Sequence, residues 1–234
     1  MDISPIVLLV LPAALFSIIC HEIGHGYAAY LGGDDTTRLQ GRLSFNPIVH
    51  IDPIGTVLVP LIMLLSPVRL PLIGWARPVP VNPANLRSRK WDLAVSLAGV
   101  TFNLALAATA VLLLKVFLIA GFTDHLSAGL DEMNSFDIAF VLLNAFIVVN
   151  LVLMLFNLLP IPPLDGSHVL LHFIRMRDSA LFAVFEFLER FGLLILLLLV
   201  WSGGFRYILW PILDLVLGVL LFIFQVPRGM VIFL

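Results

Sequence analysis

Long apolar runs, separated by short polar or proline-rich stretches, dominate the pattern of this 234-residue chain. A helix needs about 20 predominantly apolar residues to cross a bilayer. Runs that predict membrane-spanning helices cover 5–31, 92–120, 137–159, 191–201 and 206–226, and the fourth can begin earlier, near Phe182. The pattern therefore predicts an all-α polytopic membrane protein with about five or six transmembrane helices.

The stretches between these runs predict four smaller elements. Residues 36–46 partly alternate polar and apolar positions, which indicates a short strand pair, a β element associated with the membrane. Residues 51–66 are apolar but contain Pro53 and Pro60, so we expect a re-entrant segment and not a full span. Residues 67–91 are proline-rich and basic and predict an interfacial loop. Residues 167–190 predict an amphipathic helix at the interface.

The composition agrees with a membrane protein and excludes several other classes. Hydrophobic residues make up 61% of the chain and charged residues 12%, against about 25% charged residues in soluble domains. The formal net charge of −2 gives no support to nucleic-acid binding. The single cysteine, Cys20, excludes an internal disulfide and a cysteine-based zinc finger, and we interpret it as a packing residue.

The distribution of basic residues predicts the orientation in the membrane. Seven of the thirteen lysines and arginines lie between residues 32 and 91, three lie within 172–190, and the loop 121–136 has none. If 51–66 re-enters the membrane, all the basic loops face the cytoplasm. We therefore expect the N-terminus outside and the polar motif described next nearer the cytoplasmic side.

The first apolar run contains the sequence His21-Glu22-Ile23-Gly24-His25, an H-E-x-x-H pattern. Positions four apart share one face of a helix, so His21 and His25 can reach one metal ion. Glu22 lies about 100° around the helix from His21, where it can take a proton from a metal-bound water. Ionisable groups at this depth in a membrane are costly and usually mark a functional site.

A hydrolytic zinc site usually has three protein ligands, and Asp165 is the candidate for the third. It follows a proline-rich stretch at the cytoplasmic end of the 137–159 run, where an extended backbone can carry a carboxylate inward. Gly166 permits a close or left-handed turn after it. His50 and Asp52 are expected to anchor the re-entrant segment, and His168 and His172 to be an incidental interfacial pair, although both pairs could also bind metal.

The motifs H-E-I-G-H at 21–25 and N-L-L-P-I-P-P-L-D-G at 157–166 resemble those of the site-2 protease family of intramembrane metalloproteases, peptidase family M50. The resemblance covers residues 5–170. It implies His21, His25 and Asp165 as ligands of one Zn²⁺ per chain, and Glu22 as the general base. It also implies Asn157 and Asn103 as candidates for substrate or oxyanion contacts, and a short prokaryotic form without PDZ or CBS domains.

We therefore expect one integral-membrane protease domain over 1–234, with a catalytic core at 5–170. Residues 171–234 would add the interfacial helix and two C-terminal spans. The expected function is hydrolysis of peptide bonds in or near transmembrane segments of membrane-protein substrates, in the cell membrane of a prokaryote. A membrane metal-ion transporter and a zinc-binding scaffold that cuts nothing are the alternatives. A transporter usually needs polar groups along its whole path, whereas here they are concentrated at one depth, which argues against transport. A scaffold that only binds zinc would not need Glu22, which argues against that alternative.

Overall fold

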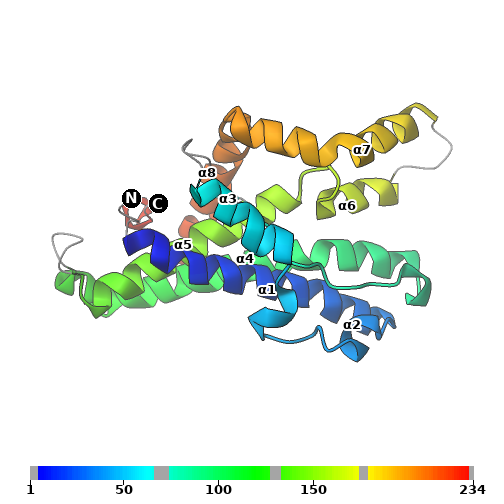
Figure 1. The fold of residues 1–234 in the computed structure, drawn as a ribbon. Coiled ribbons are helices and arrows are strands. Elements are labelled where there is room, and N and C mark those ends of the chain that lie inside the picture. The colour runs from blue at the N-terminus through cyan, green and yellow to red at the C-terminus, as the bar shows by residue number, and fades with distance from the viewer. Residues whose placement is uncertain (1–4, 66–73, 127–132, 174–178, 232–234) are drawn as a thin grey trace.

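The computed structural model describes residues 5–65, 74–126, 133–173 and 179–231, and all the regular structure in these ranges is helical (Figure 1). The helices are α1 (Pro5–Gly32), α2 (Thr36–Leu39), α3 (Val59–Leu65), α4 (Arg89–Ile119), α5 (Ser135–Asn157), α6 (Asp165–Phe173), α7 (Ser179–Trp201) and α8 (Gly204–Phe224). Short 3₁₀ turns occur at Pro47–His50, Pro83–Asn85, Phe122–His125 and Arg228–Met230, and a π-helical turn at Pro53–Leu58.

Four helices in the described part of the chain are long and apolar enough to cross a membrane. They cover Leu9–Gly32, Arg89–Ile119, Ser135–Asn157 and Arg206–Phe224. The protein is therefore an all-α, multi-pass membrane protein. Helix α7 is not among the four, because Glu186, Glu189 and Arg190 lie in its middle. Helices long and apolar enough to span a membrane therefore support four of the five or six predicted spans.

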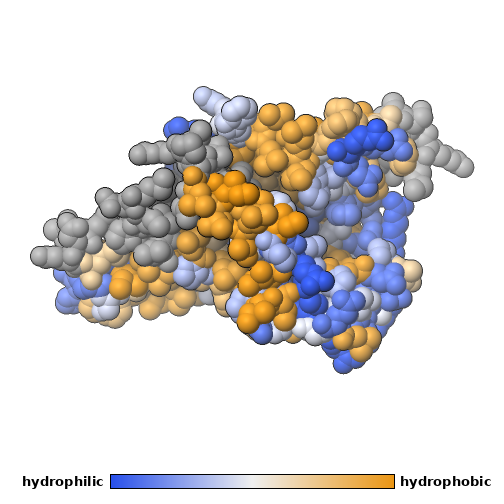
Figure 2. Space-filling view, in the orientation of Figure 1, coloured by the Kyte–Doolittle hydropathy of each residue, from blue (hydrophilic) through white to orange (hydrophobic). Residues whose placement is uncertain are grey.

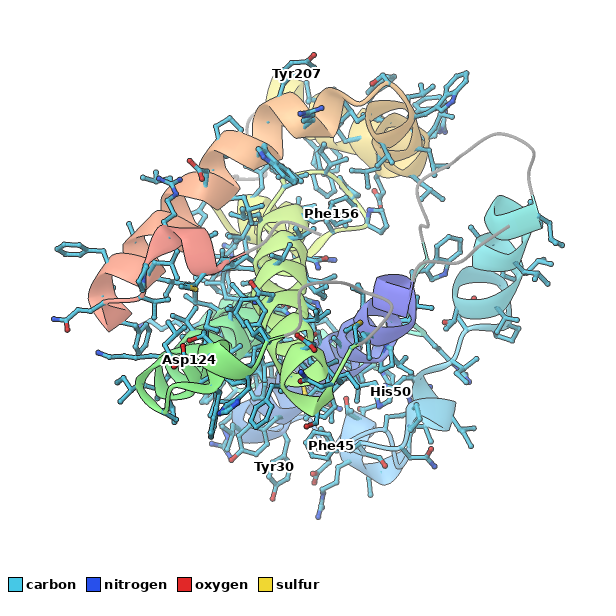
Figure 3. All side chains as sticks on the ribbon, turned by 90° about the vertical axis from the view of Figure 1, so that its left-hand side faces the viewer. Tyr30, Phe45, His50, Asp124, Phe156 and Tyr207 are labelled. Atoms are coloured by element: carbon cyan, nitrogen blue, oxygen red, sulfur yellow. The ribbon has the colours of Figure 1, made fainter. Side chains whose placement is uncertain are left out.

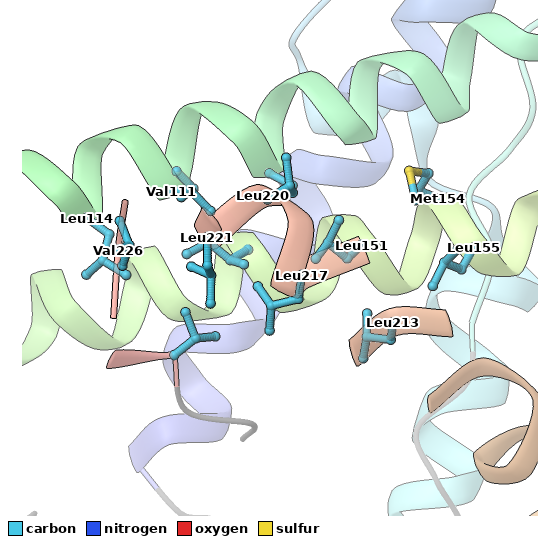
Figure 4. Packing of buried hydrophobic residues seen from close by; sticks show 14 of the residues in the cluster. Val111, Leu114, Leu151, Met154, Leu155, Leu213, Leu217, Leu220, Leu221 and Val226 are labelled. Carbon is cyan, nitrogen blue, oxygen red and sulfur yellow. The ribbon is translucent and has the colours of Figure 1, made fainter. Parts of the chain in front are cut away.

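Helices α1, α4 and α5 pack against one another and form the centre of the bundle. Helix α8 packs against α5 and α4. Figure 3, which looks at the bundle from its left-hand end, shows α5 between α1 and α8. The apolar core lies where α4, α5 and α8 meet, and Figure 4 shows its packing. Fully buried members include Val111, Leu114, Leu151, Leu213 and Leu217. The side chain of Tyr207, at the start of α8, is instead 82% exposed and points away from the bundle (Figure 3).

Local sequence explains where the central helices begin and end. The Asn134 side chain accepts hydrogen bonds from the backbone N–H groups of Phe136 and Asp137, and the Asp137 carboxylate accepts one from the Asn134 N–H. This capping box starts α5. Helix α1 stops at Gly32 because Gly33 has a φ of +106°, a conformation that favours glycine. The end of the first apolar run, at residue 31, therefore predicted the end of α1 within one residue.

The strand pair predicted over 36–46 is wrong. Thr36–Leu39 forms the helical turn α2, and the residues after it form turns and bends. The carboxylate of Asp34 accepts hydrogen bonds from both the N–H and the hydroxyl of Thr36, which favours a helical turn over an extended chain. No β-strand occurs among the described residues, so the structure gives no membrane-associated β element there.

The single interfacial helix predicted over 167–190 is also wrong in its boundaries. Helix α6 ends at Phe173, and residues 174–178 lie outside the described residues. Helix α7 then continues from Ser179 to Trp201 without the break expected near 190. Glu186, Glu189 and Arg190 therefore share one helix with the apolar run that follows them, in agreement with the alternative start of that run near Phe182. Hydrophobic periodicity alone cannot locate a helix end that is not marked by glycine or proline.

The segment predicted to re-enter the membrane is a pair of short helical pieces, Pro53–Leu58 and α3. Asp52 caps it, because its carboxylate accepts hydrogen bonds from the N–H groups of Ile54 and Gly55. Asp52 therefore caps the start of this segment, while re-entry into the membrane stays a prediction. From residue 74 to 82 the chain has no regular secondary structure and runs toward α4.

The surface reflects this arrangement. Apolar side chains cover much of the visible face between the two ends of the bundle, and hydrophilic ones gather mainly at the end where α2 and α6 lie (Figure 2). This end is also where α1 stops and α4 begins. The polar motif of α1 lies in the half of that helix nearer this end.

Candidate metal centre

Helix α1 carries the H-E-x-x-H motif on its buried side, facing α4. His21 and His25, one turn apart, are 7% and 8% exposed. The facing residues of α4 are Val95, Gly99 and Asn103, also at spacings of four. His25 contacts Val95 and His21 contacts Asn103, so the two helices run antiparallel with these rows in register.

Gly99 makes room for the two imidazoles. A Cβ atom at this position would lie 2.3 Å from Nε2 of His25 and 2.5 Å from Cε1 of His21. Any side chain on Gly99 would therefore have to displace both rings. The close approach of α4 to the histidines requires a glycine there.

Asp165 completes a triangle of possible ligand atoms. Its Oδ2 lies 3.2 Å from Nε2 of His21 and 3.2 Å from Nε2 of His25, and the two Nε2 atoms are 3.1 Å apart. Zinc binds such atoms tetrahedrally at about 2.0–2.2 Å, which places neighbouring ligand atoms about 3.3 Å apart. The triangle therefore has the size of one face of a zinc tetrahedron. It is the one group of three or more potential ligands found among the described residues.

The hydrogen bonds of the histidines determine which nitrogen is free to bind a cation. Nδ1 of His25 lies 2.7 Å from the Val95 carbonyl oxygen, which can only accept, so this nitrogen carries the proton. Nδ1 of His21 lies 2.7 Å from Oδ1 of Asn103. Both Nε2 atoms therefore present lone pairs toward Oδ2 of Asp165, which is buried and receives no hydrogen bond from the described residues. Three acceptors in contact repel unless a cation joins them, so this donor set fits a zinc ion.

The chain that carries Asp165 is a compact turn between α5 and α6. The N–H of Ile161 donates to the Leu159 carbonyl and the N–H of Leu164 to the Ile161 carbonyl. A Cβ atom on Gly166 would lie 2.3 Å from the Leu158 carbonyl oxygen. Gly166 therefore allows a close contact between the start of α6 and the end of α5, as the sequence predicted. It does not adopt the left-handed conformation that was the other possibility.

Glu22 is oriented by the irregular segment 74–82. Its Oε2 accepts a hydrogen bond from the N–H of Val79 at 2.8 Å. Arg42 supports this segment, because its guanidinium donates to the carbonyl oxygens of Arg77 and Pro78. Burial, and then the charge of Arg77, lower the pKa of Arg42, while the carboxylate of Glu22 acts in the opposite direction.

A second anchor of the segment lies just beyond the end of α1. The fully buried carboxylate of Asp34 accepts hydrogen bonds from Thr36, from the N–H of Asn82 at 2.7 Å and from the side-chain amide of Asn85 at 2.9 Å. Burial alone would raise the pKa of Asp34, but these donors outweigh it and hold the pKa below its usual value. The chain is thus held on both sides of Val79, by Arg42 at Arg77 and Pro78 and by Asp34 at Asn82.

The two asparagines singled out from the sequence lie in different surroundings. Asn103 is fully buried behind His21, so in this conformation it has no surface for a substrate. Asn157, the last residue of α5, is half-buried and donates its amide to the Leu153 carbonyl at 3.0 Å. His168 is exposed and follows Asp165 on α6, outside the ligand triangle.

Sequence reasoning missed the partners that orient the motif. These are Val95, Gly99 and the backbone N–H of Val79. A signal for the first two was present, because Val95, Gly99 and Asn103 repeat the four-residue spacing of the histidines. The backbone N–H of Val79 leaves no sequence signal, since every residue except proline has one.

Comparisons with known proteins show the family of this chain. A family model for peptidase family M50 matches residues 9–199, and the chain belongs to this family. It is 37% identical to the "Putative zinc metalloprotease YwhC" of Bacillus subtilis over 86% of this chain and 83% of that protein. It is 30% identical to the "Putative zinc metalloprotease Rip2" of Mycobacterium tuberculosis, over 88% of this chain and 73% of that protein. The comparison with solved structures found no match.

Proposed function

We propose that this protein is an intramembrane zinc endopeptidase that hydrolyses peptide bonds in or near the transmembrane segments of membrane-protein substrates. The observation that carries the proposal is the triangle of His21 Nε2, His25 Nε2 and Asp165 Oδ2, in which both histidines lie on a membrane-spanning helix with Glu22 next to His21. Membership in peptidase family M50 supports the same reaction class.

His21, His25 and Asp165 would hold one zinc ion per chain. When bound, zinc supplies Lewis acidity, which activates a water molecule and polarises the scissile carbonyl. Glu22 would take up the proton of the attacking water and pass it to the leaving amine. The Val79 N–H holds Oε2 of this carboxylate, so the proton would be accepted at Oε1. Asn157 remains a candidate for contact with the substrate.

We also propose the expected orientation, with the N-terminus outside the cell membrane of a prokaryote and the centre nearer the cytoplasmic side. The end of the bundle with α2 and α6 contains Arg38, Arg42 and Arg89, in agreement with the positive-inside rule.

A helical substrate hides its peptide bonds, so helix-breaking residues near the scissile bond are expected.

The test uses the purified full chain reconstituted in lipid vesicles with a panel of single-span peptides that carry glycine, asparagine or proline near one end of the span. Mass spectrometry identifies the products, and zinc per chain is measured in parallel. We expect wild type to cleave a subset of peptides at one site each. Glu22→Gln should bind zinc and cleave none, whereas Glu189→Gln on α7, the same chemical change outside the centre, should cleave like wild type.

The other outcomes separate the alternatives. Zinc flux across the vesicle membrane without cleavage would favour a transporter and overturn the proposal. One bound zinc per chain with neither flux nor cleavage of any peptide would favour a scaffold. Cleavage by Glu22→Gln at the wild-type rate would remove the assigned general base.

A further inference from the structure

A row of buried polar side chains leads from His21 on α1 across α4 and α5 and returns to α1 at Ser17, one turn before His21. Oδ1 of Asn103 on α4 contacts Nδ1 of His21 at 2.7 Å, and its amide donates to Oδ1 of Asn150 on α5 at 2.9 Å. The amide of Asn150 donates to the Ser17 hydroxyl at 2.9 Å, and Ser17 donates to the Ala13 carbonyl at 2.7 Å. Asn103, Asn150 and Ser17 are each 0% exposed. The row therefore joins α1, α4 and α5 without contact with solvent.

Backbone carbonyls determine the direction of every hydrogen bond in this row. The amide of Asn150 also donates to the Phe146 carbonyl at 2.8 Å, and a carbonyl oxygen can only accept. Asn150 therefore cannot turn its own oxygen toward Phe146, and this oxygen must face Asn103. The amide of Asn103 must then point to Asn150, which turns Oδ1 of Asn103 toward His21. His21 can meet that oxygen only with a proton on Nδ1.

We propose that Asn103, Asn150 and Ser17 are positioning residues that hold His21 in the tautomer with its proton on Nδ1, so that Nε2 is free to bind the metal. The Phe146 carbonyl, three links away, sets this tautomer. His25 obtains the same tautomer directly from the Val95 carbonyl. Both histidines therefore carry their proton on Nδ1 and leave Nε2 free. In His25 a backbone carbonyl fixes this tautomer directly, and in His21 the relay of side chains does so.

A purely structural function would not require this arrangement. Buried asparagines in membrane bundles often serve as hydrogen bonds between helices. Asn144 on α5 is equally buried and donates to the Phe140 carbonyl of its own helix. The relay differs because it ends on a ring nitrogen of a candidate metal ligand. Partners that orient a metal-binding histidine typically change metal affinity by about 10- to 100-fold when they are removed.

The inference rests on the proposed zinc site but not on proteolysis, so its first test measures zinc affinity. The full chain in detergent is titrated against a zinc chelator of known affinity. We expect Asn103→Leu to weaken binding about 10- to 100-fold. Asn150→Leu should weaken it in the same direction by a smaller factor, because the Asn103 amide is then free to turn over. Asn144→Leu is the matched control and should bind zinc like wild type.

The second test reads the tautomer without zinc. The protein is zinc-free and carries ¹⁵N-labelled histidine, and the pH is raised until the His21 signal is that of a neutral ring. Wild-type His21 should then give the shifts of an Nδ1–H ring, assigned by difference with His21→Gln. Asn150→Leu should give a mixture of tautomers, and Asn144→Leu the wild-type signal. An unchanged His21 signal in Asn150→Leu, with zinc affinity equal to that of Asn144→Leu, would overturn the relay. If wild type binds no zinc, the zinc site fails and the ¹⁵N shifts alone decide whether the relay sets the tautomer.

Discussion

The carboxylate of Glu22 accepts a hydrogen bond from the backbone N–H of Val79 at 2.8 Å, although the two residues are 57 positions apart in the sequence. The segment that provides this N–H is held by Arg42 and Asp34. The orientation of the proposed general base therefore depends on a stretch of chain with no regular secondary structure. This dependence gives the first of four predictions.

Val79→Pro removes the backbone N–H that donates the hydrogen bond to Glu22. A hydrogen bond to a charged group contributes about 1.5–3 kcal/mol, so we expect cleavage to fall about 10- to 100-fold. Zinc content should stay at the wild-type value, because neither residue belongs to the ligand triangle. Val79→Ala, which keeps the N–H, is the control. Equal cleavage rates for the two variants would show that this hydrogen bond does not position Glu22.

Gly99→Ala should weaken zinc binding by about tenfold or more, because the added Cβ would lie 2.3 Å from Nε2 of His25 and force the ring to move. Gly218→Ala on α8 is the control, since a Cβ there meets nothing within 4 Å. Both changes raise helix propensity by about 1 kcal/mol, so this effect cancels in the comparison. Zinc competition and thermal unfolding measure the result. Wild-type zinc affinity in Gly99→Ala would contradict the close packing described here.

Asp165→Ala should reduce zinc from about one per chain to a small fraction, because a hydrolytic zinc site needs three protein ligands. Zinc content after gel filtration measures this directly, with Asp124→Ala, an exposed residue at the opposite end of the bundle, as the control. Undiminished zinc in Asp165→Ala would move the third ligand elsewhere, with His50, Asp52 and His168 as the next candidates.

Asp34→Asn should destabilise the protein at neutral pH by about 1–3 kcal/mol, because the buried carboxylate loses its charge against several donors. Its pKa is lowered in the folded state, so its contribution is fully present above the unfolded pKa of about 3.9 and is lost as the pH falls through the folded pKa. The difference in unfolding free energy between wild type and variant should therefore shrink below about pH 4.

Denaturation in detergent across this pH range measures that difference. Asp35→Asn is the control, because Asp35 forms an exposed ion pair with Arg38, and such pairs contribute little. A difference that stays constant down to pH 3 would mean that the Asp34 carboxylate is not selectively stabilised in the folded state.

The long helices were predictable because each one is specified locally. An apolar run of sufficient length must satisfy its backbone hydrogen bonds within the membrane, and a helix does this within one segment. The runs at 5–31, 92–120 and 137–159 are therefore found within three residues of the ends of α1, α4 and α5. The short polar segments were not predictable in the same way. Whether 36–46 forms strands or a turn depends on Asp34, whose partners Asn82 and Asn85 are far along the chain.

By itself, the sequence determined the membrane class, the family motifs and the pairing of His21 with His25, because these follow from composition and from helical spacing. The tertiary structure decided how the centre is built: that Asp165 meets the two Nε2 atoms, that Gly99 leaves room for the rings, and that Asn103 lies behind His21. These relationships join segments 70 or more residues apart. Only the packing of α4 against α1 and the turn after α5 bring these segments together. A local sequence pattern cannot predict contacts between segments so far apart in the chain.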